Sequence, residues 1–289
     1  MEMFYTYFCK RLHLSLWEAN FMGLKMKKRS GKKAWMLLVM SLLIAAVPIT
    51  ASAASDSTAY AKLNFSNNKY YIFNNSWGSS SVSGWSQSVY VNSNTDLGYV
   101  WNWPTTAGGV KAYPSLVSGW HWTEGYTPGS GLPTRLSANK NINTGVGYSK
   151  ASNTNGEYNN AYDIWLHDIG NATWSSTPTE EIMIWNEWTS GVGPIGSKVF
   201  SDVSIGGQTY DLYRGEITDN GVHQWWVYSF LKKSKSPNNF SINVKNFTDY
   251  LISKSYFTNS KYVSSVEYGT EITKGSGQIN YSNWYVNVQ

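Results

Sequence analysis

Hydrophobic and polar residues alternate with a period of two along most of the chain after residue 69. Successive side chains of a strand point to opposite faces, so this alternation predicts β-strands with one buried face. Gly, Asn, Pro and Ser separate the segments, as expected for turns. The predicted strands are residues 70–74, 87–92, 98–103, 116–122, 160–167, 181–185, 198–205, 208–215, 224–231, 263–271 and 279–288.

Two short stretches depart from plain alternation in an informative way. Gly206-Gly207 separates two predicted strands and permits the positive φ angles of a two-residue hairpin turn. Residues 243–254 instead follow a helical period, with Asn243 in the position of an N-cap. One face of that helix would carry Val244, Phe247, Tyr250, Leu251 and Lys254.

These elements predict an all-β domain with one short helix. About eleven short antiparallel strands favour a jelly-roll β-sandwich, in which two antiparallel sheets form a substrate cleft. The chain shows no repeat of 20–50 residues and no low-complexity linker. We therefore expect a single domain over residues 54–289.

Residues 1–53 are predicted to be a leader rather than part of the fold. A basic region at residues 27–33 precedes an apolar run at residues 34–49 and the small residues Ala51-Ser52-Ala53. This order is typical of a secretory signal peptide, and the run is shorter than the roughly 20 residues of a membrane span. Translation would begin at Met26, after an unused upstream start. The protein is expected to be secreted and extracellular, without a membrane anchor once the leader is removed.

Removing the leader changes the charge of the protein. It holds 8 of the 23 Lys and Arg residues and 2 of the 18 Asp and Glu residues, which leaves 15 − 16 = −1. A nearly neutral domain gives no support for nucleic-acid binding. The only cysteine, Cys9, also lies in the leader. A domain of this size can be stabilised by its own core, and we expect a monomer.

Aromatic residues suggest what the domain binds. Of the 15 tryptophans, 13 lie outside the leader, among abundant Asn, Ser, Thr and Gly. An aromatic ring with a polar rim can stack on the C–H face of a sugar, whereas a tryptophan inside a sandwich is simply core. We expect about half of the tryptophans to be core.

Several kinds of catalytic site find no support in the sequence. The predicted domain lacks cysteine, and His121, His167 and His223 do not form an H-E-x-x-H motif. No P-loop, Rossmann or G-x-S-x-G motif occurs, so no metal or other cofactor is expected. A Ser/His/Asp triad stays open but nothing indicates one. The carboxylates are the remaining candidates.

Strand geometry selects among these carboxylates. In residues 181–185, alternation places Glu181 with Met183 and Trp185 on one face, opposite two isoleucines. Glu180 would point the other way or into the preceding turn. A carboxylate on a face that also carries a thioether and an indole is well placed to act on a sugar.

Two further strands carry acids in the same manner. Glu267 and Glu271 share a face with Gly269, and Asp163 shares one with Trp165 and His167. Glycosidic cleavage needs two facing carboxylates, one to protonate the leaving oxygen and one to attack or to activate water. A third acid can shift the pKa values of such a pair. Alternatively, each of these acids could be salt-bridged or could protect a sheet edge.

Several motifs in a fixed order resemble those of glycoside hydrolase family 12, secreted endo-β-1,4-glucanases that include xyloglucan-cleaving members. The resemblance covers essentially all of the predicted domain. The matching segments are residues 74–78 (NNSWG), 110–113 (VKAY), 161–163 (AYD), 181–185 (EIMIW), 193–197 (GPIGS), 244–247 (VKNF) and 269–271 (GTE).

The resemblance implies a retaining β-jelly roll and a role for each candidate. Glu181 would be the nucleophile, Glu271 the acid/base, and Asp163 a partner hydrogen-bonded to the nucleophile. The substrate-binding residues implied are Asn75, Trp77, Met183, Trp185 and Glu267, with Trp77 as a sugar-stacking platform and Glu267 as a polar cleft residue. The segment Asn186-Glu187-Trp188-Thr189 departs from the family pattern, and we expect Glu187 to influence the subsites.

The predicted function is therefore hydrolysis of internal β-1,4-glucosidic bonds in soluble β-glucans such as xyloglucan and cellulose-like glucans. The partner would be the polysaccharide itself. Two alternatives are a non-catalytic carbohydrate-binding jelly roll and a xylanase-like specificity on the same fold. A binding module has no need of two facing glutamates, and the M-I-W strand favours a glucanase.

Overall fold

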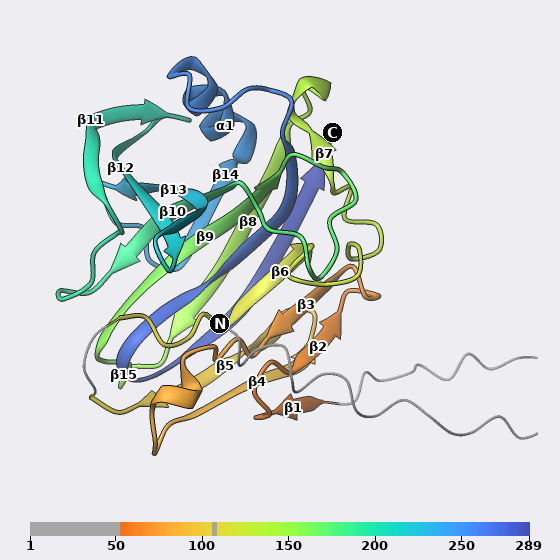
Figure 1. The fold of residues 1–289 in the computed structure, drawn as a ribbon. Coiled ribbons are helices and arrows are strands. Elements are labelled where there is room, and N and C mark those ends of the chain that lie inside the picture. Colours follow the sequence, from red (N-terminus) through yellow and green to blue (C-terminus); the bar gives the residue numbers. More distant parts are fainter. Residues whose placement is uncertain (1–52, 106–108) are drawn as a thin grey trace, which may run out of the picture. The chain divides into compact units, whose positions relative to one another are not determined.

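The computed structural model describes residues 53–105 and 109–289. The predicted signal peptide and upstream start therefore lie outside the described residues, except for Ala53. Figure 1 shows the strands curving around one another, with the single helix at one end. The predicted fold class is confirmed: the described residues form a jelly roll of antiparallel strands, with one parallel pair between β10 (Glu180–Trp188) and β13 (Val222–Lys232).

The strands of the first half of the domain are short, and those of the second half are long. The first half comprises β1 (Ala54–Asp56), β2 (Lys62–Phe65), β3 (Tyr70–Phe73), β4 (Ser86–Ser93), β5 (Asp96–Trp103), β6 (Ser115–Gly119), β7 (Thr134–Arg135) and β8 (Ile142–Lys150). The second comprises β9 (Glu157–His167), β10 (Glu180–Trp188), β11 (Ser197–Ile205), β12 (Gln208–Asp219), β13 (Val222–Lys232), β14 (Asn239–Asn243), α1 (Val244–Ser253) and β15 (Tyr262–Val288).

Strand β15 belongs to both sheets of the sandwich. Its first half pairs with β9 and β6, in the sheet that also contains β10, β13, β12 and β11. Its second half pairs with β5 and β8, in the opposite sheet. The crossing lies near Gly275, whose φ of 105° is strained for any residue with a side chain. Residues 263–271 and 279–288, predicted as two strands, are thus parts of one (Figure 1).

The core lies between the two sheets and confirms the predicted alternation. Ile182 and Ile184 of β10 are completely buried in it, together with Ile164 of β9. Val266 and Tyr268 of β15 belong to the same cluster. The odd-numbered residues of β9, of β10 up to Trp185 and of β15 from Ser265 to Glu271 therefore face away from this core.

Helix α1 and the hairpin also confirm the sequence predictions. The Asn243 side chain accepts a hydrogen bond from the Lys245 N–H, as an N-cap does. The helix buries Val244, Phe247, Thr248 and Leu251, while Tyr250 is half-buried. In the turn between β11 and β12, Gly206 and Gly207 have φ angles of 57° and 75°, which fit a type I′ turn.

Strand β6 was predicted too long, and β1, β2, β7, β8 and β14 were not predicted. Strand β6 ends at Gly119 rather than at Trp122, because Gly119 adopts a φ of 102° close to the Ser264 carbonyl. Strand β8 was not predicted, since Gly145 and Gly147 interrupt its alternation. A side chain at Gly145 would collide with the ring of Tyr285. Strand β14 was also missed, and it pairs with β8.

Candidate active site

Glu181 lies on the face of β10 that is turned away from the core. Met183 and Trp185 share this face and pack with Ala161 of β9. The Trp225 indole of β13 donates a hydrogen bond from Nε1 to Glu181 Oε2 at 2.7 Å. Such a bond stabilises the ionised carboxylate and fixes its orientation.

Glu271 projects from β15 on the same side of the sheet, directly opposite Asn159 of β9. The Asn159 side chain donates a hydrogen bond to Glu271 Oε2, and its Oδ1 accepts one from the Glu271 N–H at 3.4 Å. Glu271 and Trp185 line a cavity of about 280 Å³. Asn159 lines it as well, with Gly109, Val110, Glu157, Gly191, Val192, Gly193, Thr273 and Lys274.

Asp163 lies between β10 and β15, opposite both Met183 and Glu267. It is buried, and its Oδ1 has no hydrogen-bond partner among the described residues. Burial, and then repulsion from Glu181, Glu267 and Glu271, raises the Asp163 pKa well above its usual range. The implied hydrogen bond between Asp163 and Glu181 is absent from the described residues; the two carboxyls interact through their charges.

Burial is the largest cause of the pKa shift at both Glu181 and Glu271. It raises the pKa of Glu181 to about 8. The hydrogen bond from Trp225 lowers this pKa, and repulsion from Glu271 raises it further. It raises the pKa of Glu271 to about 6, against the hydrogen bond from Asn159. Taken singly, these values would place the proton on Glu181, the reverse of the implied roles. Repulsion from Glu271 is part of the Glu181 shift, so the two carboxyls hold one proton between about pH 6 and 8 rather than both being ionised.

Glu267 is completely buried and satisfied by neighbouring side chains. Its carboxylate accepts hydrogen bonds from Ser115 Oγ at 3.2 Å and Ser265 Oγ at 3.0 Å, and lies 2.7 Å from His121 Nδ1. It pairs with Asp163 across β15 and β9, on the same face as the other acids. A substrate contact for Glu267 stays a prediction.

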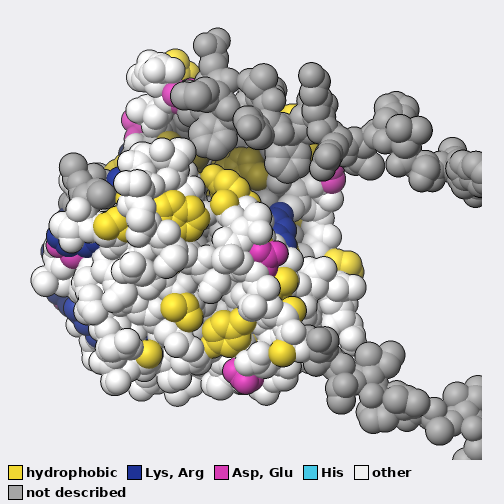
Figure 2. Space-filling model, turned by 90° about the horizontal axis from the view of Figure 1, so that it is seen from below, with side chains coloured by type: hydrophobic (Ala, Val, Ile, Leu, Met, Phe, Trp, Pro, Cys, Tyr) yellow, Lys and Arg dark blue, Asp and Glu magenta, His cyan; other side chains and the backbone are white. Residues whose placement is uncertain are grey.

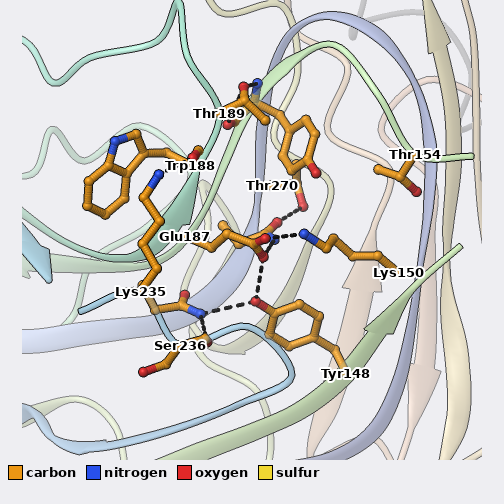
Figure 3. A network of polar contacts seen from close by, with 12 residues as sticks. Tyr148, Lys150, Thr154, Glu187, Trp188, Thr189, Lys235, Ser236 and Thr270 are labelled. Atoms are coloured by element: carbon orange, nitrogen blue, oxygen red, sulfur yellow. Dashed lines mark hydrogen bonds and ion pairs between the residues drawn. The ribbon is translucent and has the colours of Figure 1, made fainter. Parts of the chain in front are cut away.

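Glu187 differs from expectation, because β10 contains a bulge between Trp185 and Glu187. The extra residue turns Glu187 to the core side, where its carboxylate pairs with Lys150 (Figure 3). It therefore does not face the same side as Glu181. Glu180 is likewise buried and lies 3.2 Å from Lys261 Nζ.

The other implied binding residues differ in their exposure. Trp77 is 48 % exposed, as a stacking platform requires. Asn75 is buried, and its backbone carbonyl accepts a hydrogen bond from the Tyr113 N–H at 2.9 Å. Met183 and Trp185 are buried beside Glu181, and Trp185 lines the cavity.

The sequence reasoning missed three residues near the acids. Trp225 and Asn159 hold the two glutamates, and Trp122 is 38 % exposed with a left-handed φ of 43°. The Trp122 ring meets Trp165 edge-on at 5.0 Å between centroids. Alternation could have placed Trp225 on the Glu181 side of the sheet. No sequence signal linked either residue to a particular acid.

Within residues 53–105 and 109–289, His, Asp and Glu nowhere gather in groups of three that could hold a metal ion. In the same part of the chain, no helix is long and apolar enough to cross a membrane.

Comparisons with known proteins agree with this geometry. Endoglucanase S from Pectobacterium parmentieri is 47 % identical over 251 residues, covering 86 % of this chain and 92 % of that protein. Xyloglucan-specific endo-beta-1,4-glucanase A from Emericella nidulans is 29 % identical over 226 residues, covering 76 % and 85 %. The native family 12 xyloglucanase from Bacillus licheniformis superimposes with a TM-score of 0.78 at 55 % identity, covering 82 % of this chain and all of that one. The family model described as Glycosyl hydrolase family 12 matches residues 68–289, and the chain belongs to that family.

Proposed function

We propose that this protein is a secreted, retaining endo-β-1,4-glucanase that acts on xyloglucan and related soluble β-glucans. Membership of the family makes it a glycoside hydrolase of the endoglucanase and xyloglucanase kind. The observation that carries the finer proposal is the pair Glu181 and Glu271. They lie on the same side of one sheet, near enough for their charges to interact.

A double displacement would use the two glutamates in turn. Glu271 donates its proton to the glycosidic oxygen while ionised Glu181 attacks the anomeric carbon and forms a glycosyl–enzyme ester. Glu271, now ionised, then removes a proton from water, which attacks the same carbon and releases Glu181. The singly protonated pair is the form that can begin this cycle. Asp163, kept protonated by its surroundings, adds no further negative charge beside Glu181.

Unpartnered polar groups support binding of a polyhydroxylated ligand at this face. Among the described residues, Asp163 Oδ1, Trp165 Nε1 and Trp185 Nε1 are buried without a hydrogen-bond partner. Buried polar atoms normally have partners, and sugar hydroxyls can both donate and accept. Exposed Trp77 offers a stacking surface in addition. Figure 2 shows one face of the molecule, on which uncharged polar atoms predominate and hydrophobic side chains are scattered between them.

Substrate preference is proposed from the relatives. One relative and one similar structure are named as xyloglucan enzymes, and another relative as an endoglucanase. Product analysis on xyloglucan, unbranched mixed-linkage glucan, carboxymethylcellulose and xylan would rank the substrates. Preferential release of oligosaccharides from xylan would overturn the glucanase assignment in favour of a xylanase-like specificity.

Secretion is proposed from the sequence of the leader alone. Residues 27–53 have the order of a signal peptide. Expression of the full chain in a secreting bacterial host, followed by N-terminal sequencing of the extracellular protein, should find a start close to residue 54. Protein retained in the cells with its leader intact would contradict this.

The catalytic roles are tested by substitution and by stereochemistry. Glu181→Ala and Glu271→Ala should each abolish hydrolysis of a β-1,4-glucan while leaving the circular dichroism spectrum and thermal unfolding unchanged. Proton NMR of the first product formed by the wild-type protein should show the β-anomer, as retention requires. The α-anomer would refute double displacement, and near-wild-type turnover in either variant would refute its assigned role. A wild-type protein that bound glucan without cleaving it would be a binding module.

A further inference from the structure

A bulge in β10 turns an acidic side chain away from the cleft. Trp185 pairs with Ala161 of β9 on the cleft side, but Glu187 pairs with Asn160, the next residue back along β9. Asn186 is the extra residue, and it is completely buried on the core side. Its side chain donates to Tyr148 Oη at 3.1 Å and accepts from the Tyr268 hydroxyl at 2.9 Å. The bulge therefore sends two consecutive polar side chains into the sandwich.

The Glu187 carboxylate joins the two sheets of the sandwich. It pairs with Lys150 of β8, in the opposite sheet. It also accepts hydrogen bonds from the Tyr148 hydroxyl at 3.1 Å and from Asn160 Nδ2 at 3.0 Å. Figure 3 shows the Tyr148 and Lys150 side chains converging on Glu187. Forming an ion pair that is mostly shielded from water costs desolvation free energy, and such additional hydrogen bonds offset that cost.

This network continues to the residue next to the proposed acid/base. Asn160 Oδ1 accepts a hydrogen bond from Thr270 Oγ1 at 2.6 Å. Thr270 and Asn160 are direct partners between β15 and β9, and so are the following residues Glu271 and Asn159. The two pairs lie back to back: Asn160 and Thr270 face the core, whereas Asn159 and Glu271 face the cleft. Tyr99 of the opposite sheet also contacts Thr270, at 2.6 Å between oxygens.

We propose that Glu187, paired with Lys150, is a positioning residue for Glu271, acting through Asn160 and Thr270. Holding Asn160 and Thr270 fixes the separation and twist of β9 and β15 at the point where Glu271 leaves the sheet. Asn159, which holds the Glu271 carboxyl, is fixed with them. The inference rests on the proposed function, because it assumes that Glu271 is the acid/base.

Displacing a general acid has a specific kinetic signature. Protonation matters when the leaving group is a poor one, and much less when the leaving group departs as a stable anion. General acid catalysis contributes about 10²- to 10⁴-fold, and a displacement of about 1 Å can cost about 10²-fold. The loss should therefore appear in kcat/KM for a phenyl β-glycoside but not for its 2,4-dinitrophenyl counterpart. Merely weakened packing or folding would lower both values alike.

The test compares kcat/KM for phenyl and 2,4-dinitrophenyl β-cellotriosides. Glu187→Gln keeps the size of the side chain but removes the charge that pairs with Lys150. We expect the phenyl value to fall at least about tenfold, while the dinitrophenyl value changes less than about threefold. If this variant does not fold, the double variant Lys150→Met/Glu187→Gln leaves no unpaired charge and should show the same discrimination.

Glu180→Gln is the matched control. Glu180 lies at the other end of β10, is buried and has a lysine partner, Lys261 at 3.2 Å. Glu180→Gln should change kcat/KM for the two substrates by the same factor. The inference would be overturned if the folded Glu187 variants lost kcat/KM equally on both substrates or lost none. It would also be overturned if Glu180→Gln discriminated between the two substrates as well. Glu271→Ala must itself lower kcat/KM more for the phenyl than for the dinitrophenyl substrate. If it does not, Glu271 is not the acid/base, and the proposed function is refuted rather than the role of Glu187.

Discussion

Replacing Trp225 by Phe removes one hydrogen bond from Glu181 and retains most of the surrounding ring packing. The Trp225 indole donates to Glu181 Oε2 at 2.7 Å. Its ring contacts Trp165 edge-on, with centroids 5.6 Å apart, and lies 6.5 Å from the Trp122 ring. A phenyl ring preserves part of these contacts but has no donor. The substitution therefore tests the hydrogen bond more than the packing.

The size of the effect follows from the charge on Glu181. A hydrogen bond to a charged group contributes about 1.5–3 kcal/mol. The bond from Trp225 lowers the pKa of Glu181 against the effect of burial, so its loss favours the protonated nucleophile. Within the singly protonated pair, the balance then shifts further toward the proton on Glu181 and away from the form that has Glu271 protonated. Since about 1.4 kcal/mol corresponds to a factor of ten, kcat/KM at pH 7 should fall about 10- to 100-fold.

The assay is kcat/KM against pH, measured on glucan and on both aryl cellotriosides. Because every substrate needs an ionised nucleophile, Trp225→Phe should lower the phenyl and dinitrophenyl values together, unlike Glu187→Gln. Trp226→Phe is the control, since Trp226 follows on the same strand, packs against the core and stacks on Arg214. A Trp225→Phe variant within about twofold of wild type, with an unmoved pH profile, would refute the role given to this bond.

Two further predictions concern pH. The kcat/KM profile of the wild-type protein should be bell-shaped, with its limbs near pH 6 and 8. Below about pH 6, Glu181 and Glu271 are both protonated, so the ionised nucleophile is lost. Above about pH 8, both are ionised, so the general acid is lost. A profile that rises or falls only once would contradict the shared-proton pair. Glu267→Gln should retain most activity and move the alkaline limb to lower pH, because Glu267 raises the pKa of Glu181 and Asp163. Inactivation with the fold intact would instead make Glu267 the acid.

Alternation predicted much of the site because it reflects a physical requirement. A strand buried between two sheets must place its apolar residues on one side, and a shift by one residue would expose all of them. Ile182 and Ile184 meet this requirement, so the opposite face of β10 could be assigned from sequence up to Trp185. The same reasoning placed Asp163 and Glu271 on the cleft side of their strands.

The failures occurred where local geometry depends on distant residues. Nothing in the sequence around Asn186 marks a bulge, which forms where the side chain finds Tyr148 and Tyr268 inside the sandwich. The bulge therefore turns Glu187, which was expected to influence the subsites, toward the core. Glu267 was placed on the correct face, but its burial depends on His121, 146 residues earlier in the chain. Alternation gives the side on which a residue lies, not what covers it.

The two faces of β9 explain why residues of the core can matter to the chemistry. Asn159 and Asn160 are adjacent, yet one holds Glu271 in the cleft and the other holds Thr270 in the sandwich. Because consecutive side chains of a strand point in opposite directions, the support for a catalytic side chain comes from its sequence neighbours on the opposite face. Glu181 illustrates the contrast: its neighbour Ile182 is held by apolar packing, and its polar support, Trp225, comes from the adjacent strand on the cleft side. On the proposed roles, the acid/base Glu271 would be supported by a buried polar network, whereas the nucleophile Glu181 would be supported by a single hydrogen bond and a well-packed core.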